Sequence, residues 1–234
     1  MGPPSEILKE VGHRPWPLPS GPWIMMQSWH DLLFAHWRMA PEQLRPLLPK
    51  SLTLDTFEGD AWIGITPFHM HLRPRGLPSV SHFPELNCRT YVEFGGKPGV
   101  FFFSLDAGSR LAVWGAKTFY LLPYFHAHVK IRKEGDRIRY ISRRSSAPAS
   151  LSANYAPSGP VRDSRRGTLE HWLTERYCLY AYSRQRLYRG KSIMFLGPCR
   201  TRPAKLRRTV SRLRAELRYP KLRLYCTLPA SSMS

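Results

Sequence analysis

The amino-acid sequence predicts a mainly β domain of the α+β class, an antiparallel barrel-like or double-sheet structure with a few short helices. Short runs rich in aromatic and β-branched residues alternate in polarity, as strands do. Turn signals separate these runs, for example Glu58-Gly59-Asp60 and Glu134-Gly135-Asp136. The 22 prolines in 234 residues favour turns and extended segments over long helices. Short strands joined by hairpins are typical of a barrel or a sandwich.

The chain divides into three parts: a proline-rich arm (1–24), one folded domain (25–190) and a basic tail (191–234). A domain of this length can bury one substantial core. Helix-start signals predict short helices, which cover 41–48, 107–121 and a segment after the capping residue Thr168. The alternating runs predict strands, which cover 52–57, 61–72, 85–92, 99–106, 124–132, 137–142 and 177–182.

Charged residues interrupt one of the apolar strands. Since alternate residues of a strand share a face, Glu85, Asn87, Arg89 and Tyr91 line one side of it. Glu85 and Arg89 are separated by roughly 13 Å along the strand and do not easily pair with each other. A buried charge needs a partner. Partners must therefore come from other strands, a water-filled cavity or a ligand, unless the face is simply open to solvent.

The next strand favours an interior location for this polar face. Phe102, Ser104 and Asp106 alternate with Phe101, Phe103 and Leu105. A strand with three consecutive phenylalanines is not expected to have a face open to water. We therefore predict that the polar residues of the two strands line a small-molecule cavity.

Several motifs carry a resemblance to a known family. They are Trp29-His-Asp-Leu-Leu-Phe-Ala-His-Trp37, Pro84-Glu-Leu-Asn-Cys-Arg-Thr-Tyr-Val92, Pro98-Gly-Val-Phe-Phe-Phe-Ser-Leu-Asp106, Leu122-Pro-Tyr124 and Leu173-Thr-Glu-Arg-Tyr177. From about His13 to Gly190 the chain resembles the YqjF-like family of uncharacterised bacterial proteins. The resemblance implies a fold of the acetoacetate decarboxylase-like superfamily, a β-barrel-like domain around a small-molecule cavity. It implies no particular reaction, because no activity is established for the family as a whole.

The resemblance bears on the chemistry of the predicted cavity. The superfamily's named enzyme forms a Schiff base on a lysine activated by a neighbouring cation. This sequence has no Lys-Lys pair and carries Leu122-Pro123-Tyr124 in the region that resembles the nucleophile segment. We therefore expect no imine-forming decarboxylase, and we expect Lys117 to be a structural or anion-binding cation.

Glu85 resembles the superfamily's cavity glutamate and is the candidate catalytic residue. A carboxyl in an apolar pocket has a raised pKa and can carry a proton near neutral pH. The alternative is a salt bridge from Glu85 to an arginine such as Arg89 or Arg143. The candidate ligand-binding residues are Glu85, Asn87, Arg89, Tyr91, Ser104, Asp106 and Tyr124.

The sequence predicts neither a metal centre nor a cofactor. His69-Met-His71 and His126-Ala-His128 each place two imidazoles on one strand face, but neither pair has a third ligand of known position. The four cysteines form no C-x-x-C pair, and no phosphate loop or dinucleotide fingerprint occurs. Ser104 lacks the G-x-S-x-G context of a hydrolase.

The formal charge of +20 is concentrated at the end of the chain. Residues 1–190 and 191–234 each carry a net charge of +10, although the second segment is much shorter. Alternation stops at Lys191, where the family resemblance also ends. The codons of residues 193–200 can also be read in the frame that starts at their third base. In that frame they can encode His-His-Val-Pro-Trp-Pro-Leu-Gln, which resembles a run in the family. We therefore interpret 191–234 as a frameshift product with no native fold; the alternative is a natural tail that binds nucleic acid or anionic lipid.

Three functions follow from these features. The first is an uncharacterised YqjF-like barrel that binds a small anionic or carbonyl-bearing molecule, with Arg89 orienting the ligand and Glu85 carrying a proton. The second is a non-catalytic structural or interaction barrel in which Glu85, Asn87, Arg89 and Asp106 form an internal network. The third is nucleic-acid binding through the tail, which we do not expect if the tail is a frameshift product. No membrane span or signal segment is recognisable, so we expect a cytoplasmic protein without a membrane partner. The sequence does not predict its oligomeric state.

Overall fold

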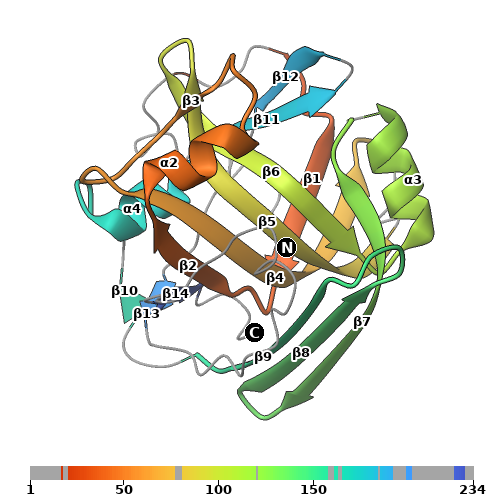
Figure 1. Cartoon of the computed structure of the whole chain (residues 1–234). Coiled ribbons are helices and arrows are strands. Elements are labelled where there is room, and N and C mark those ends of the chain that lie inside the picture. The colour runs from red at the N-terminus through yellow and green to blue at the C-terminus, as the bar shows by residue number, and fades with distance from the viewer. Residues whose placement is uncertain are drawn as a thin grey trace.

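A single curved sheet dominates the computed structural model (Figure 1). The structure describes residues 17, 21–76, 81–119, 121–157, 161–162, 165–183, 185–191, 199–201 and 224–229. Fourteen strands of this described part belong to the sheet. They are β1 (Met25–His30), β2 (Phe34–Met39), β3 (Thr53–Leu54), β4 (Ala61–Pro74), β5 (Ser81–Phe94), β6 (Lys97–Ala107), β7 (Tyr124–Glu134), β8 (Arg137–Arg144), β9 (Ser150–Tyr155), β10 (Val161–Arg162), β11 (Cys178–Ser183), β12 (Arg186–Lys191), β13 (Cys199–Thr201) and β14 (Leu224–Pro229).

The sheet is mixed, with an antiparallel centre. Strands β2, β4, β5 and β6 pair antiparallel in that order, whereas β6 pairs in parallel with both β7 and β11. Figure 1 shows β4, β5 and β6 crossing the middle of the molecule, with the β7–β8 hairpin extending from one edge. The sheet curls into a half-barrel. The predicted fold class, mainly β with few helices, is confirmed.

The helices are short; two begin where the sequence indicates, and the third begins at Arg110 instead of 107, because strand β6 continues to Ala107. They are α2 (Pro41–Leu44), the 3₁₀ helix η1 (Arg45–Leu47), α3 (Arg110–Phe119) and α4 (Leu169–Thr174). Pro41 occupies the first turn of α2, where its missing N–H costs nothing. The Thr168 hydroxyl accepts a hydrogen bond from the His171 amide (3.3 Å) and so caps α4, as predicted.

Two apolar clusters cover opposite faces of the central strands. One face carries Phe34, Trp62, Phe68 and Phe102, against which Leu173 of α4 and Val113 of α3 pack. The other carries Ala35, Ile63, Ile65 and Cys88 under residues of the β8–β9 hairpin. The first face is also the face of Glu85, because Phe68 pairs with Glu85 in the β4–β5 ladder. That face holds the candidate site.

The predicted boundaries of the arm and the tail fall largely outside the described residues. Of the arm, residue 17 and residues 21–24 are described; the guanidinium of Arg75 lies 6.0 Å from the Trp23 ring. Of the segment 191–234, the described part is residue 191, β13 and β14, and β14 pairs with β2. No helix in the described residues is long and apolar enough to cross a membrane.

Candidate functional site

The polar residues of β5 lie together on one face and are buried. Glu85 and Asn87 are each 1% exposed, Arg89 is 3% exposed and Tyr91 is fully buried. The antiparallel pairing on both sides of β5 keeps the two-residue alternation that the sequence predicts. The solvent-facing alternative for this face is therefore wrong. We call Glu85, Asn87, Arg89 and Tyr91 the β5 polar row.

Glu85 stands at one end of the row, in contact with Tyr124 of β7. The Tyr124 hydroxyl donates a hydrogen bond to Glu85 Oε2 (3.0 Å), and the Tyr140 hydroxyl donates to the Glu85 main-chain oxygen (2.9 Å). Burial raises the pKa of Glu85 to about 8, although hydrogen bonds from Tyr124 and Asn87 act in the opposite direction. The Glu85 carboxyl is therefore mainly protonated at neutral pH, as expected for a carboxyl in an apolar environment.

Arg89 is a buried cation without a carboxylate partner. Within the described residues no Asp or Glu forms an ion pair with it, and its Nε atom is buried without a hydrogen-bond acceptor. The Arg89 guanidinium carbon lies 5.0 Å from the Phe34 ring centre and 5.9 Å from that of Tyr91. These aromatic faces offset only part of the cost of burying the charge. The alternative role of Glu85, a salt bridge to Arg89 or Arg143, does not occur among the described residues.

The opposite end of the row is a histidine–tyrosine pair. His36 Nε2 lies 2.7 Å from the Tyr91 hydroxyl, which itself donates to the Leu173 main-chain oxygen (3.1 Å). Since the hydroxyl has one proton to donate, both contacts are satisfied by the His36 tautomer that carries its proton on Nε2 and donates to Tyr91. Burial, and secondly the charge of Arg89, hold the pKa of His36 well below its usual value. His36 is therefore neutral at pH 7.

Strand register explains why these side chains meet. His36, Gly64 and Arg89 occupy equivalent positions on β2, β4 and β5, because His36 pairs with Gly64 and Gly64 pairs with Arg89. A Cβ atom at Gly64 would lie 2.9 Å from two atoms of the His36 ring and 3.5 Å from Arg89 Cγ. The missing side chain of Gly64 therefore makes the space in which the imidazole lies beside the guanidinium.

Unpartnered polar atoms lie beside Arg89. Thr66 pairs with Asn87 across β4 and β5 and is fully buried. Thr66 Oγ1 and Asn87 Oδ1, like Arg89 Nε, have no hydrogen-bond partner among the described residues. Buried polar atoms are nearly always paired. Three unpaired atoms lie at neighbouring positions of one face, where they can hydrogen-bond a further group.

Arg176 is a second buried cation near Tyr91. Its Nη1 atom bonds Asp55 Oδ2 (2.6 Å), and its guanidinium lies 4.2 Å from the Trp172 ring centre and 5.2 Å from that of Tyr91. Arg176 Nη2 is buried without a partner. Four residues of this site were not predicted from the sequence: His36, Gly64, Thr66 and Arg176. Only the strand register and the position of α4 bring them to the β5 polar row.

Ser104 and Asp106 do not join the predicted site. Ser104 pairs with Cys88 and Asp106 pairs with Leu86, so both belong to the opposite face of the sheet from Glu85. A β-bulge between Cys88 and Arg89 shifts the register, and Phe102 then pairs with Arg89. Phe102 is thus part of the Glu85 face, and the grouping of Ser104 and Asp106 with Glu85 is corrected.

Asp106 has a different partner on its own face. Arg144 of β8 bonds Asp106 Oδ1 through Nη2 (2.6 Å) and Nε (2.9 Å). The predicted internal network therefore separates into the β5 polar row on one face and the Asp106–Arg144 pair on the other. Tyr124, by contrast, contacts the Glu85 carboxyl.

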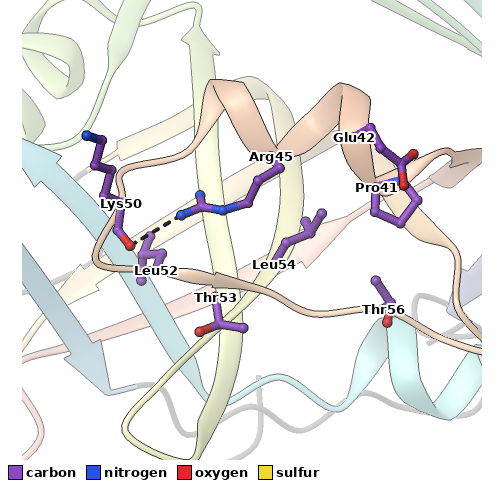
Figure 2. A pocket seen from close by; sticks show the side chains of 8 residues that line it. All are labelled: Pro41, Glu42, Arg45, Lys50, Leu52, Thr53, Leu54 and Thr56. Atoms are coloured by element: carbon purple, nitrogen blue, oxygen red, sulfur yellow. Dashed lines mark hydrogen bonds between the residues drawn. The ribbon is translucent and has the colours of Figure 1, made fainter.

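Lys117 lies away from the β5 polar row. It is exposed on α3, with its ammonium 5.4 Å from the Phe125 ring centre. No lysine is buried in the described part of the chain. A hollow of about 420 Å³ near α2 is also separate from the row (Figure 2); its lining residues are Pro41, Glu42, Arg45, Lys50, Leu52, Thr53, Leu54 and Thr56. The Arg45 guanidinium there bonds the main-chain oxygen of Lys50 (3.2 Å), among others, and so closes the loop after η1.

The fold is that of acetoacetate decarboxylase-like proteins. The acetoacetate decarboxylase of Legionella pneumophila superposes with a TM-score of 0.60 at 16% identity, covering 95% of this chain and 92% of that one. An acetoacetate decarboxylase-like enzyme from Sphingomonas wittichii RW1 gives a TM-score of 0.61 at 12% identity, over 87% and 88% of the two chains. The enduracididine biosynthesis enzyme MppR, solved with pyruvate, gives 0.60 at 11% identity, over 90% and 88%. At these identities the similarity establishes the fold alone.

The chain belongs to the DUF2071 family of uncharacterised conserved proteins, whose pattern matches residues 26–193. The protein YqjF of Bacillus subtilis (strain 168), itself uncharacterised, is 50% identical over 176 residues, which is 73% of each chain. The resemblance read from the motifs is confirmed.

Proposed function

We propose that the protein binds a small anionic molecule, a carboxylate or carbonyl-bearing acid, at Arg89. The main evidence is the burial of Arg89, which is 3% exposed yet has no carboxylate partner among the described residues. An uncompensated buried charge costs several kcal/mol, on the order of 3–5 when one partner of a buried pair is missing. An anion beside the guanidinium would remove most of that cost.

The atoms around Arg89 support a ligand with both acceptor and donor groups. Arg89 Nε can donate a hydrogen bond to an acceptor such as a carboxylate oxygen, whereas Asn87 Oδ1 can accept one from a donor. Thr66 Oγ1 can serve as either. An acid that carries a hydroxyl, or that binds together with a water molecule, would satisfy all three atoms.

Glu85 is the candidate proton carrier of this site. Its carboxyl is held by Tyr124 and has a pKa of about 8, so it can both donate and accept a proton near neutral pH. Imine chemistry is not part of the proposal, because Lys117 is exposed and no other lysine of the described part is buried. Reduction with borohydride in the presence of pyruvate should therefore leave Lys117 unmodified; a covalent adduct detected by mass spectrometry would contradict this.

Ligand binding tests the proposal directly. Pyruvate is a suitable first probe, because the structural neighbour MppR was solved with it, and acetate and phosphate give the comparison series. We expect isothermal titration to detect carboxylate binding to the wild type and at least a tenfold loss in Arg89→Gln. Arg38→Gln is the matched control, since Arg38 is exposed and pairs with Asp60. Equal affinity of wild type and Arg89→Gln for every acid would refute the proposal.

A structural role for the β5 polar row is the competing function. The cation–π contacts of Arg89 with Phe34 and Tyr91 favour it. In that case Arg89→Gln should lower the melting temperature while no acid raises that of the wild type. The two functions therefore differ in the response of the wild-type protein to ligand.

We also propose that residues 191–234 arise from a frameshift. The family match ends at residue 193, close to the point at which alternation stops. The nucleotide sequence around the Gly190 codon tests this, and a codon series without a slipped run of G would contradict it. If the tail is instead a selected nucleic-acid-binding segment, salt-sensitive DNA or RNA binding should disappear when 191–234 is deleted.

A further inference from the structure

Four histidines from three adjacent strands meet at one end of the sheet. His30 of β1 pairs with His69 of β4, and His71 of β4 pairs with His82 of β5. Paired residues of neighbouring strands, and residues two apart on one strand, point to the same face. The sequence shows only the His69-Met-His71 pair; the register supplies the missing third and fourth imidazoles.

The rings are in contact with one another. The His71 ring centre lies 4.3 Å from that of His30, 5.2 Å from that of His69 and 4.0 Å from that of His82. Two imidazoles bound to one zinc ion place their ring centres roughly 5 Å apart, because each ligating nitrogen lies about 2.1 Å from the metal. The observed separations are close to this value. We propose that His71, together with at least two of His30, His69 and His82, binds a divalent transition metal such as Zn²⁺, Ni²⁺ or Cu²⁺.

Binding requires the rings to turn. As the side chains lie in the described residues, no group of three His, Cys, Asp or Glu could hold a metal ion. The ladders of β1, β4 and β5 fix the main chain, so the proposed site forms by rotation of the imidazoles. His30, His69 and His71 are half-buried and His82 is exposed, which means that rotation disturbs little packing and that a metal can enter from solvent.

The donor set of the cluster suits a transition metal. Metal ligation uses the neutral imidazole. Imidazole ligands without sulfur or several carboxylates favour Zn, Ni and Cu over Mg or Ca.

The chain contains its own control. His126 and His128 on β7 form a second His-x-His pair, with ring centres 5.3 Å apart. No other histidine ring contacts this pair among the described residues. If two imidazoles sufficed, both places would bind metal equally. If three are needed, only the His71 cluster would.

The experiment is zinc titration of the full chain, prepared without a polyhistidine tag. We expect calorimetry to give one site per chain in the wild type, and Co²⁺ to give the visible absorption of a low-symmetry nitrogen site. His71→Gln should weaken zinc binding by at least about tenfold, because losing even a residue that only contacts a metal ligand typically has an effect of this size. His128→Gln should leave zinc binding unchanged.

His82→Gln provides a second test with little risk to folding, because His82 is exposed. Zinc should raise the melting temperature of the wild type more than that of His71→Gln or His82→Gln. The proposal is overturned if the wild type takes up no zinc, if both variants bind it as tightly as the wild type, or if His128→Gln weakens binding as much as His71→Gln.

Discussion

Replacing Glu85 with glutamine should change how the stability of the protein depends on pH. The folded-state pKa of Glu85 is about 8, whereas the ordinary value is 4.5. Between these values the folded protein holds a proton that the unfolded chain has lost. The free energy of unfolding must therefore fall as the pH rises through this window, and it should level off above about pH 8.

The size of the effect follows from the width of the window. Each pH unit within it changes the free energy of unfolding by about 1.4 kcal/mol. From pH 5 to pH 9 the wild type should lose roughly 4 kcal/mol through Glu85 alone, as an upper bound. Glutamine cannot ionise but keeps an oxygen that accepts the hydrogen bond of Tyr124. Glu85→Gln should thus lie within about 1 kcal/mol of the wild type at pH 5 and be clearly more stable at pH 9.

Urea denaturation at pH 5, 7 and 9, followed by circular dichroism, measures this difference. Glu134→Gln is the control, because Glu134 is exposed beside the β7–β8 turn and should keep the wild-type slope. A wild type whose stability does not fall above pH 5, or a Glu85→Gln protein with the same slope as the wild type, would refute the assignment of a protonated, buried Glu85.

Two further substitutions test one interaction on each face of the sheet. Gly64→Ala should destabilise by about 1–3 kcal/mol in urea, because the new Cβ would lie 2.9 Å from the His36 ring. Asp106→Asn should cost roughly 3–5 kcal/mol in the same assay, because it leaves the largely buried Arg144 cation without a charged partner.

Each of these two changes has a control within the chain. Gly115→Ala on α3 meets no atom within 4 Å and should be neutral or stabilising by up to about 1 kcal/mol. Asp60→Asn removes an exposed pair with Arg38, which is worth about 0–1 kcal/mol. If Gly64→Ala were as mild as Gly115→Ala, the close approach of His36 would be wrong. A cost of Asp106→Asn no larger than that of Asp60→Asn would show that the Arg144 pair contributes little.

The alternation of polarity within single strands could be read from the sequence. It located the β5 polar row correctly, because a two-residue period needs no knowledge of neighbouring strands. The order of the motifs along the chain predicted the family, and the family resemblance in turn predicted the fold. The cap of α4 by Thr168 was likewise local, since it depends on residues three positions apart.

The pairing between strands could not be read in this way. Shifting a ladder by one residue moves every side chain to the other face. The register of β6, with its bulge opposite Arg89, places Phe102 beside the β5 polar row. The same register places Ser104 and Asp106 on the opposite face of the sheet. His36 was missed for the same reason, since it joins Arg89 only across Gly64 of the intervening strand.

The protonation states define what charge the proposed ligand should carry. Burial keeps Glu85 protonated and His36 neutral at pH 7. The Arg176 cation is compensated by Asp55 at 2.6 Å. Among the described residues, Arg89 then leaves one uncompensated positive charge at the β5 polar row. A monoanion would neutralise this charge, and a dianion would exceed it. Affinity for a monocarboxylate should therefore be greater than for a dicarboxylate of similar size. It should also weaken above about pH 8, when ionised Glu85 supplies a competing negative charge to the same interior.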